Sequence, residues 1–250
     1  MWPEVVLEGF RTARGIVRSL RIYYGDRSRA AAMDQLYRGF VRRGDLVFDI
    51  GAHVGDRVAS FRRLGARVVA VEPQPATVWV LKLFYGRRIA IEAAAVGGEV
   101  GRTSMMINTE NPTVSTASSA FVSAARDAPG WENQRWGKSV SVPVTTLDAL
   151  IGKHGMPSFI KIDVEGFEEE ALKGLSRAVK ALSFEFTTIQ REIAIACIKR
   201  CVALGYTRFN AALGESQNFV HADWVGSADM IHWLAGLPHA ANSGDIYAAL

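Results

Sequence analysis

Apolar residues follow two rhythms along this chain. Compact apolar runs predict buried strands, and apolar residues that recur every three or four positions predict amphipathic helices. Strand-like runs occur at Leu46–Ile50, Val68–Val71, Ile89–Ile91, Phe159–Ile162, Leu182–Thr187, Thr207–Ala212 and Ile246–Leu250. Because helical patterns alternate with most of these runs, we expect a parallel, doubly wound α/β sheet.

Residues 99–145 break this alternation. Thr103–Ile107 and Val140–Val144 have the character of two paired strands, whereas residues 108–136 are rich in Ser, Thr, Asn and Ala and show no sustained period. A loop of this length inside a compact domain is usually functional or mobile. We expect this insertion, together with residues 214–244, to cover an acceptor site. Four tryptophans in these segments are candidates for stacking on a sugar ring: Trp131, Trp136, Trp224 and Trp233.

Residues 1–43 are predicted to form a helical segment ahead of one large domain over residues 44–250. Residues 4–24 and 30–42 have helical periodicity, and residues 1–45 carry nine arginines against five acidic residues. The first helix is interpreted as packing against the domain, or against a partner subunit in a homo-oligomer. The alternatives are peripheral contact of residues 4–24 with an anionic membrane surface and docking of an anionic substrate.

Length and composition narrow the classes of protein. The 250 residues are 49% hydrophobic and 22% charged, which suits a single large domain. No apolar run reaches about 18 residues and no signal peptide is recognisable, so we expect no transmembrane segment and a cytoplasmic location. Beyond residue 45 the chain has 20 basic and 20 acidic residues, so a nucleic-acid partner is not expected. Cys197 and Cys201 are predicted to be reduced thiols in a helix core.

A glycine turn and an acidic strand end indicate a cofactor site. Gly51 follows the first strand, where a glycine lets the backbone approach a ligand, and Gly55 opens the next helix, where it permits close contact with a strand. Glu72 lies 21 residues after Gly51 at the end of the second strand, where a carboxylate can accept both hydroxyls of a ribose. This combination predicts an adenosine-type ligand.

Two kinds of cofactor fit this pattern. Enzymes that bind NAD(P) usually have three glycines in the turn, because the pyrophosphate lies on a helix N-terminus. Here Asp49 stands at the strand end, where it would repel phosphate and would suit the ammonium and sulfonium groups of S-adenosylmethionine. We therefore favour S-adenosylmethionine, with an NAD(P)-dependent oxidoreductase as the alternative.

The stretch FIKIDVEGFE, residues 159–168, supplies a second acidic corner. Asp163 and Glu165 follow a buried strand, and ligands of open α/β sheets sit just beyond such strand ends. These carboxylates are candidates for chemistry. The competing interpretation is that Asp163 caps the following helix and that Glu165 only offsets its dipole.

Together these pieces make the chain resemble the FkbM family of S-adenosylmethionine-dependent methyltransferases. The matching motifs are FDIGAHVG (48–55), AVEPQP (70–75), AAAVGG (93–98), TLDAL (146–150) and IKIDVEGFE (160–168). The resemblance implies a class I, Rossmann-like methyltransferase fold with a mostly parallel seven-stranded sheet and an antiparallel last strand. It also implies methyl transfer, typically to a hydroxyl oxygen of a sugar or secondary metabolite.

The resemblance also implies roles for individual residues. Asp49, Gly51 and Gly55 would hold the methionine end of the cofactor, Glu72 and Pro73 the ribose, and Ala94 and Ala95 the adenine. His53 stands where the family commonly has Asn. It would either bond near the methionine moiety or cap the following helix.

A free alcohol is a poor nucleophile at neutral pH, so a base should assist the transfer. Asp163 and Glu165 are the candidate bases, and Asp163 is also a candidate cofactor ligand. Lys161 and Glu185 are lesser candidates, and the competing interpretation of Lys161 is that it only neutralises the acids. A metal-assisted transfer, in which Asp163, Glu165 and a distant histidine bind a hard cation, is an alternative. No histidine stands at ligand spacing, so a metal is not expected. A homologue that binds cofactor without catalysing transfer is the remaining alternative.

Overall fold

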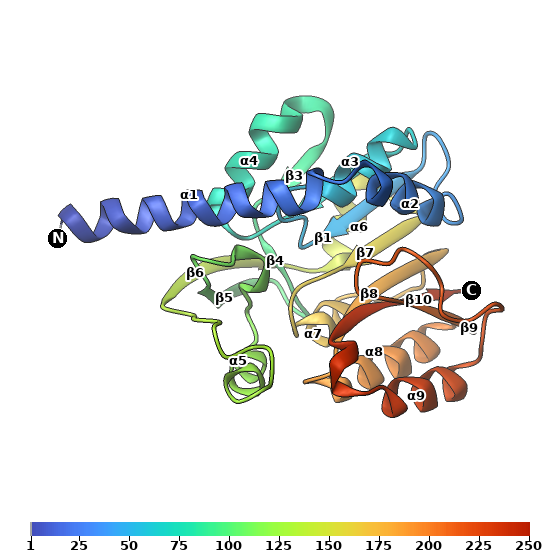
Figure 1. Cartoon of the computed structure of the whole chain (residues 1–250). Coiled ribbons are helices and arrows are strands. Elements are labelled where there is room, and N and C mark those ends of the chain that lie inside the picture. Colours follow the sequence, from blue (N-terminus) through green and yellow to red (C-terminus); the bar gives the residue numbers. More distant parts are fainter. Residues whose placement is uncertain (1) are drawn as a thin grey trace.

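A seven-stranded sheet forms the centre of the computed structural model, which describes residues 2–250 and the side chains of residues 9–250 (Figure 1). The strand order is β3-β2-β1-β7-β8-β10-β9. The bounds are β1 Leu46–Ile50, β2 Arg67–Val71, β3 Ala90–Glu92, β7 Phe159–Ile162, β8 Ala181–Thr187, β9 Arg208–Leu213 and β10 Ser243–Ala249. The last strand, β10, lies between β8 and β9 and runs antiparallel to both, whereas β3, β2, β1, β7 and β8 pair in parallel. The predicted sheet, including its antiparallel last strand, is confirmed.

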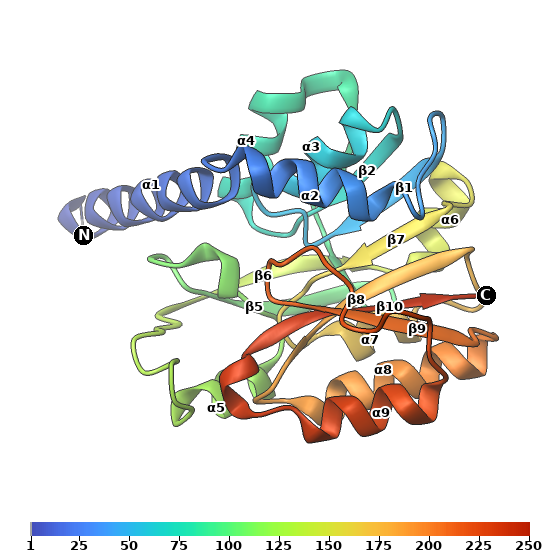
Figure 2. The same ribbon diagram turned by 45° about the vertical axis from the view of Figure 1, so that its right-hand side comes forward.

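Helices cover both faces of this sheet (Figure 2). One face carries α1 Trp2–Tyr24, α2 Arg27–Tyr37, α3 Asp56–Arg63 and α4 Pro75–Tyr85. The other carries α6 Leu147–His154, α7 Glu168–Lys173, α8 Arg191–Leu204 and α9 Ser227–Gly236. Alternate strand residues divide between two apolar cores: Val47 packs with Tyr37 and Phe61, whereas Phe48 joins the core that contains α8. Strands buried on both faces explain the continuous apolar runs.

The insertion at residues 99–145 contributes two of the three strands of a small second sheet. Its strands are β4 Ala95–Val96, β5 Gly101–Ile107 and β6 Lys138–Thr145, and β5 pairs antiparallel with β6. The predicted strand pair is therefore confirmed. The expected loop between these strands is not irregular throughout, because it holds a 3-10 turn, η2 Pro112–Val114, and the helix α5 Ser119–Arg126. Two turns are too short to display a helical period in the sequence.

Two predicted helices have other bounds in the structure. The second helix begins at Arg27, where the Asp26 side chain accepts hydrogen bonds from two backbone amides, and it ends at Tyr37 rather than at residue 42. The helix after the acidic corner covers only Glu168–Lys173. Cys197 and Cys201 are free and buried in α8, as predicted. Across residues 2–250, no helix combines the length and the apolar content that a bilayer crossing needs.

Candidate active site

A pocket opens at the carboxyl ends of β1, β2, β7 and β8. This is the edge at which open α/β sheets bind ligands. The residues predicted from sequence that line it are Asp49, Gly51, His53, Glu72, Pro73, Ala94, Ala95, Lys161, Asp163, Glu165 and Glu185. Gly55 is the one predicted cofactor residue that is not part of the lining. The fold therefore brings the glycine turn and the acidic corner to one cavity.

Glu72 is held rigidly at the end of β2. Its side chain is 2% exposed, and its two carboxylate oxygens accept hydrogen bonds from the backbone amides of His53, at 2.9 Å, and Gln74, at 2.8 Å. Burial raises the pKa of Glu72, while these hydrogen bonds oppose the rise. Each oxygen retains a lone pair, so the carboxylate can accept further hydrogen bonds from a ligand.

Both glycines of the turn lie in close contact with neighbouring segments of the chain. Gly51 has a φ of +81°, and a Cβ there would lie 1.7 Å from the backbone oxygen of Asp163. Gly51 therefore allows the turns after β1 and β7 to touch each other, and it also lines the pocket. At Gly55 a Cβ would collide with Leu81 and Tyr85 of α4. The predicted helix–strand contact at Gly55 is wrong, since the close contact joins two helices.

Asp49 and His53 each present an unpaired polar atom in the pocket. Among the described residues, no partner reaches Oδ2 of Asp49 or Nδ1 of His53. Burial, followed by the nearby Asp56, raises the pKa of Asp49 to about 7. The interpretation of His53 as a helix cap is wrong, because Gly55 is the N-cap of α3 and no side chain caps it. Instead, Nε2 of His53 lies 3.4 Å from the hydroxyl of Thr113.

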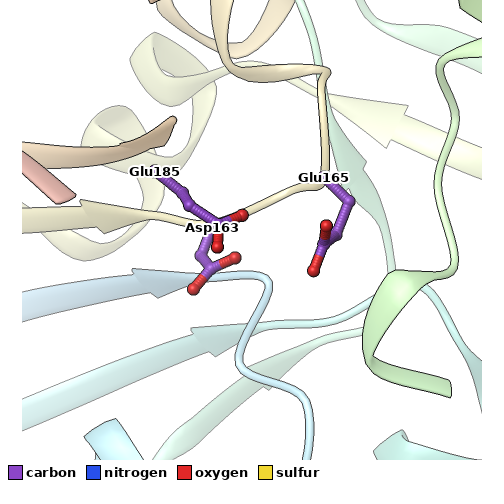
Figure 3. A group of neighbouring side chains, drawn as sticks. All are labelled: Asp163, Glu165 and Glu185. Atoms are coloured by element: carbon purple, nitrogen blue, oxygen red, sulfur yellow. The ribbon is translucent and has the colours of Figure 1, made fainter. Parts of the chain in front are cut away.

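Three carboxylates meet at the acidic corner (Figure 3). Asp163, Glu165 and Glu185 place oxygen atoms within 4.8 Å of one another. Figure 3 shows the side chains of Asp163 and Glu185 together, with Glu165 facing them. Lys161, only 1% exposed, donates to Asp163 at 3.1 Å and to Asp245 at 2.7 Å. Lys161 thus supplies the positive charge that lets these acids be buried together.

The pKa values of these three acids are shifted in opposite directions. Burial works against ionisation of Asp163, but Lys161 and Arg57 outweigh it and lower the pKa of this carboxyl. Burial and the charge of Asp163 raise the pKa of both Glu165 and Glu185 well above the ordinary value for glutamate. Asp163 therefore stays ionised, and Glu165 binds a proton more tightly than an ordinary carboxylate does.

The backbone around Glu165 is fixed from two sides. Glu165 has a φ of +55°, and its carbonyl oxygen accepts a 2.6 Å hydrogen bond from the hydroxyl of Thr116 in the insertion. Glu168 accepts from the amides of Val164 and Gly166, at 3.0 and 3.3 Å. The cap reading of Asp163 is wrong, since Phe167 occupies the N-cap of α7. These bonds hold the Glu165 side chain at the pocket.

Other lining residues could not be foreseen from the sequence. Tyr23 comes from α1, Arg57 from the first turn of α3, and Glu215 from the loop after β9. Arg57 is 8% exposed and donates to both carboxylate oxygens of Glu215, at 3.0 and 2.9 Å. Arg29 of α2 lies 3.0 Å from the same carboxylate. The N-terminal helices are thereby tied to the pocket rim.

A comparison with known families decides the identity of this site. The model of the methyltransferase FkbM domain matches residues 49–230, well over half of the chain. The chain belongs to the FkbM methyltransferase family. S-Adenosylmethionine is accordingly the cofactor of this FkbM protein.

Two other comparisons cover curated proteins and solved structures. No curated protein matches. Among solved structures, an O-methyltransferase from Bacillus cereus in complex with SAH is 10% identical, with 94% of this chain and 90% of that chain covered and a TM-score of 0.45. A TehB-like SAM-dependent methyltransferase from Corynebacterium glutamicum is 10% identical, covering 87% and 86%, with a TM-score of 0.45. Precorrin-6y C5,15-methyltransferase from Geobacter metallireducens is 12% identical, covering 88% and 86%, with a TM-score of 0.41.

The four candidate tryptophans of the FkbM protein lie outside its pocket. Trp131 and Trp136 pack edge-on against Phe121, and the indole nitrogen of Trp136 donates to the backbone oxygen of Val114. Trp224 and Trp233 also pack against other aromatic rings. None of the four lines the cavity. The expected stacking of these tryptophans on a sugar is therefore wrong, although both segments do reach the pocket through other residues.

Proposed function

We propose that this FkbM methyltransferase transfers the methyl group to a hydroxyl oxygen of a small polar acceptor, such as a sugar or secondary metabolite. The observation that carries the proposal is Glu165, a carboxylate 7% exposed in the pocket, whose pKa burial and Asp163 raise. A base of this kind suits a hydroxyl, which must lose its proton as the new bond forms.

The roles proposed for cofactor binding follow from charge and position. Glu72 would accept the ribose hydroxyls, because its oxygens are already oriented by two backbone amides. Asp49 would face the methionine ammonium with its unpaired oxygen. His53 would bond nearby through Nδ1, and the backbone of Ala94 and Ala95 would lie along the adenine.

In the proposed reaction an oxygen–methyl bond forms as the sulfur–methyl bond breaks, and the hydroxyl proton passes to a carboxylate oxygen of Glu165. Asp163 remains ionised because Lys161 lowers its pKa, so Asp163 serves to orient the cofactor and acceptor rather than to take the proton. This division supports Glu165 rather than Asp163 as the base. The protein's other task is to hold the hydroxyl in line with the methyl group and exclude water.

The test is a labelled-methyl transfer screen against hydroxylated sugars and small metabolites. With an accepted substrate, Glu165→Gln should lower kcat by about 10²- to 10⁴-fold, the range typical of a lost general base. Calorimetry with S-adenosylhomocysteine should show nearly unchanged cofactor affinity. Glu170→Gln is the matched control, because Glu170 is partly exposed on α7 outside the pocket.

Two outcomes would count against the proposal. Near-normal turnover by Glu165→Gln would remove Glu165 from proton transfer. Tight cofactor binding without transfer to any acceptor class would favour a non-catalytic role for this chain.

A further inference from the structure

Exposed apolar side chains are concentrated on two neighbouring helices. Twelve large hydrophobic residues are exposed in the described part of the chain, and seven of them belong to α1 and α4. Those of α1 are Phe10, Val17, Ile22 and Tyr24. Those of α4 are Trp79, Leu83 and Phe84, of which Trp79 is 63% and Leu83 62% exposed. Such concentration differs from the scattered surface apolar residues that need no explanation.

The two helices form one surface. At their C-terminal ends, the rings of Tyr24 and Phe84 pack edge to face at 6.2 Å, and the hydroxyls of Tyr24 and Tyr85 lie 2.9 Å apart. Farther back, Ile16 of α1 and Ala76 of α4 line one shallow hollow. Figure 2 shows both helices on the same side of the sheet. We call the exposed side of α1 and α4, residues 9–24 and 75–88, the basic apolar face.

Every charged residue on this face is an arginine or a lysine. Residues 9–24 contain Arg11, Arg14, Arg18 and Arg21, and residues 75–88 contain Lys82, Arg87 and Arg88. All seven are exposed, and neither segment contains an aspartate or glutamate. Within the described residues none of the seven cations takes part in a salt bridge. Salt bridges among the described residues therefore leave the positive charge of this face unpaired.

We propose that the basic apolar face docks on an anionic lipid membrane. Arginine and lysine would lie against lipid phosphates, where each adds electrostatic attraction. Trp79, Leu83 and Phe84 would enter the headgroup region, where aromatic and aliphatic side chains of surface helices are buried. This inference stands apart from the identity of the methyl acceptor.

A second copy of the chain fits this face less well. In a symmetric dimer the same patch meets itself, so the seven cations would face seven more. An anionic bilayer supplies opposite charge and an apolar layer at once. Charge complementarity thus favours the membrane as the occupant.

Flotation of the full chain with vesicles tests the proposal. We expect binding to vesicles in which about a third of the lipid is phosphatidylglycerol, weak binding to pure phosphatidylcholine, and release by salt. Arg18→Glu with Arg21→Glu should weaken binding by at least about tenfold, since each reversal replaces attraction by repulsion. Trp79→Ser with Phe84→Ser should weaken it by about tenfold or more.

The matched control carries the same kinds of change on the opposite side of the sheet. Lys199→Glu with Val202→Ser alters an exposed cation and an exposed apolar residue of α8 and should bind vesicles like the wild type. Calorimetry with S-adenosylhomocysteine checks that all variants are folded, because none of these residues lines the pocket. Absence of vesicle binding, equal binding to neutral lipid, or equal losses in the control would overturn the proposal. So would a wild-type dimer that Trp79→Ser converts to monomer, which would make a second copy the occupant.

Discussion

His53 offers a quantitative test of the pocket, because its ring is held neutral in a partly buried site. Burial is the main cause that lowers the pKa of His53 from 6.5 to about 4, and Arg57 adds to it against the opposing charges of Asp56 and Asp163. The folded state therefore binds this proton less readily than the unfolded chain. The stabilising contribution is complete above pH 6.5 and is lost as the pH falls through 6.5 toward 4.

The size of the effect follows from these two pKa values. The gap between 6.5 and about 4 corresponds to about 3 kcal/mol once both forms are fully protonated, and to about 2 kcal/mol between pH 8 and pH 5. His53→Asn removes the titrating group and keeps the backbone, since Asn tolerates the φ of +45° at this position. The free energy of unfolding of the wild type should therefore fall with acid by about 2 kcal/mol more than that of the variant.

Urea denaturation of both proteins at several pH values between 8 and 5 measures this difference. The other buried acids titrate in both proteins, so their contributions cancel in the comparison. His232→Asn, which removes an exposed histidine of α9, should give a curve parallel to the wild type. If the His53→Asn curve also runs parallel to the wild type, His53 is not held neutral and the described pocket geometry is wrong there.

Three further substitutions probe the contacts that shape the site. Gly51→Ala should destabilise the fold by several kcal/mol in denaturation experiments, because its Cβ would meet a backbone oxygen at 1.7 Å. The control is Gly44→Ala, at a position with a similar φ of +88° but open space around it. This control should cost only the backbone strain of about 1–2 kcal/mol. Thr116→Val removes the hydrogen bond to the carbonyl oxygen of Glu165 and should lower the free energy of unfolding by about 1–3 kcal/mol. It should also lower kcat more than it raises KM, and Thr116→Ser should restore both stability and kcat. An unchanged kcat would show that this bond does not position Glu165. Lys161→Met leaves buried carboxylates without their cation and should lower the free energy of unfolding by about 3–5 kcal/mol at pH 8. The loss should be smaller in acid, at a pH below the lowered pKa of Asp163, because that carboxyl is then protonated and neutral. A loss independent of pH would contradict this account.

Much of the fold was predictable because its signals are local. The first strand is expected and observed over the same residues, Leu46–Ile50, since its five consecutive buried positions are apolar except for Asp49. The strands of the insertion were also predicted, and they pair with Thr103 opposite Val142, although most of their residues are exposed or half-buried. Asp49, Glu72 and Asp163 could be placed at one cavity because the carboxyl ends of parallel strands meet at one edge of a sheet.

Short helices and the surroundings of single side chains were harder to predict from the sequence. The helix α5 is only eight residues long, and its buried residues Phe121 and Ala125 are too few to show a period. The tryptophans were assigned to a sugar site on chemical character alone, although they pack against aromatic rings such as Phe121 and Phe186. Residue type does not reveal which surface a side chain meets.

The sequence by itself determined the order of strands and helices, the glycine turn with its acidic partner, and the motifs that mark an FkbM methyltransferase. Only the tertiary structure decided that Tyr23 and Arg57 complete the pocket, that Gly51 accommodates a neighbouring turn, and that Glu165 rather than Asp163 has the raised pKa. The physical reason is distance along the chain. Propensity and periodicity act over a few residues, whereas burial and charge pairing join groups as far apart as Arg57 and Glu215, 158 residues away.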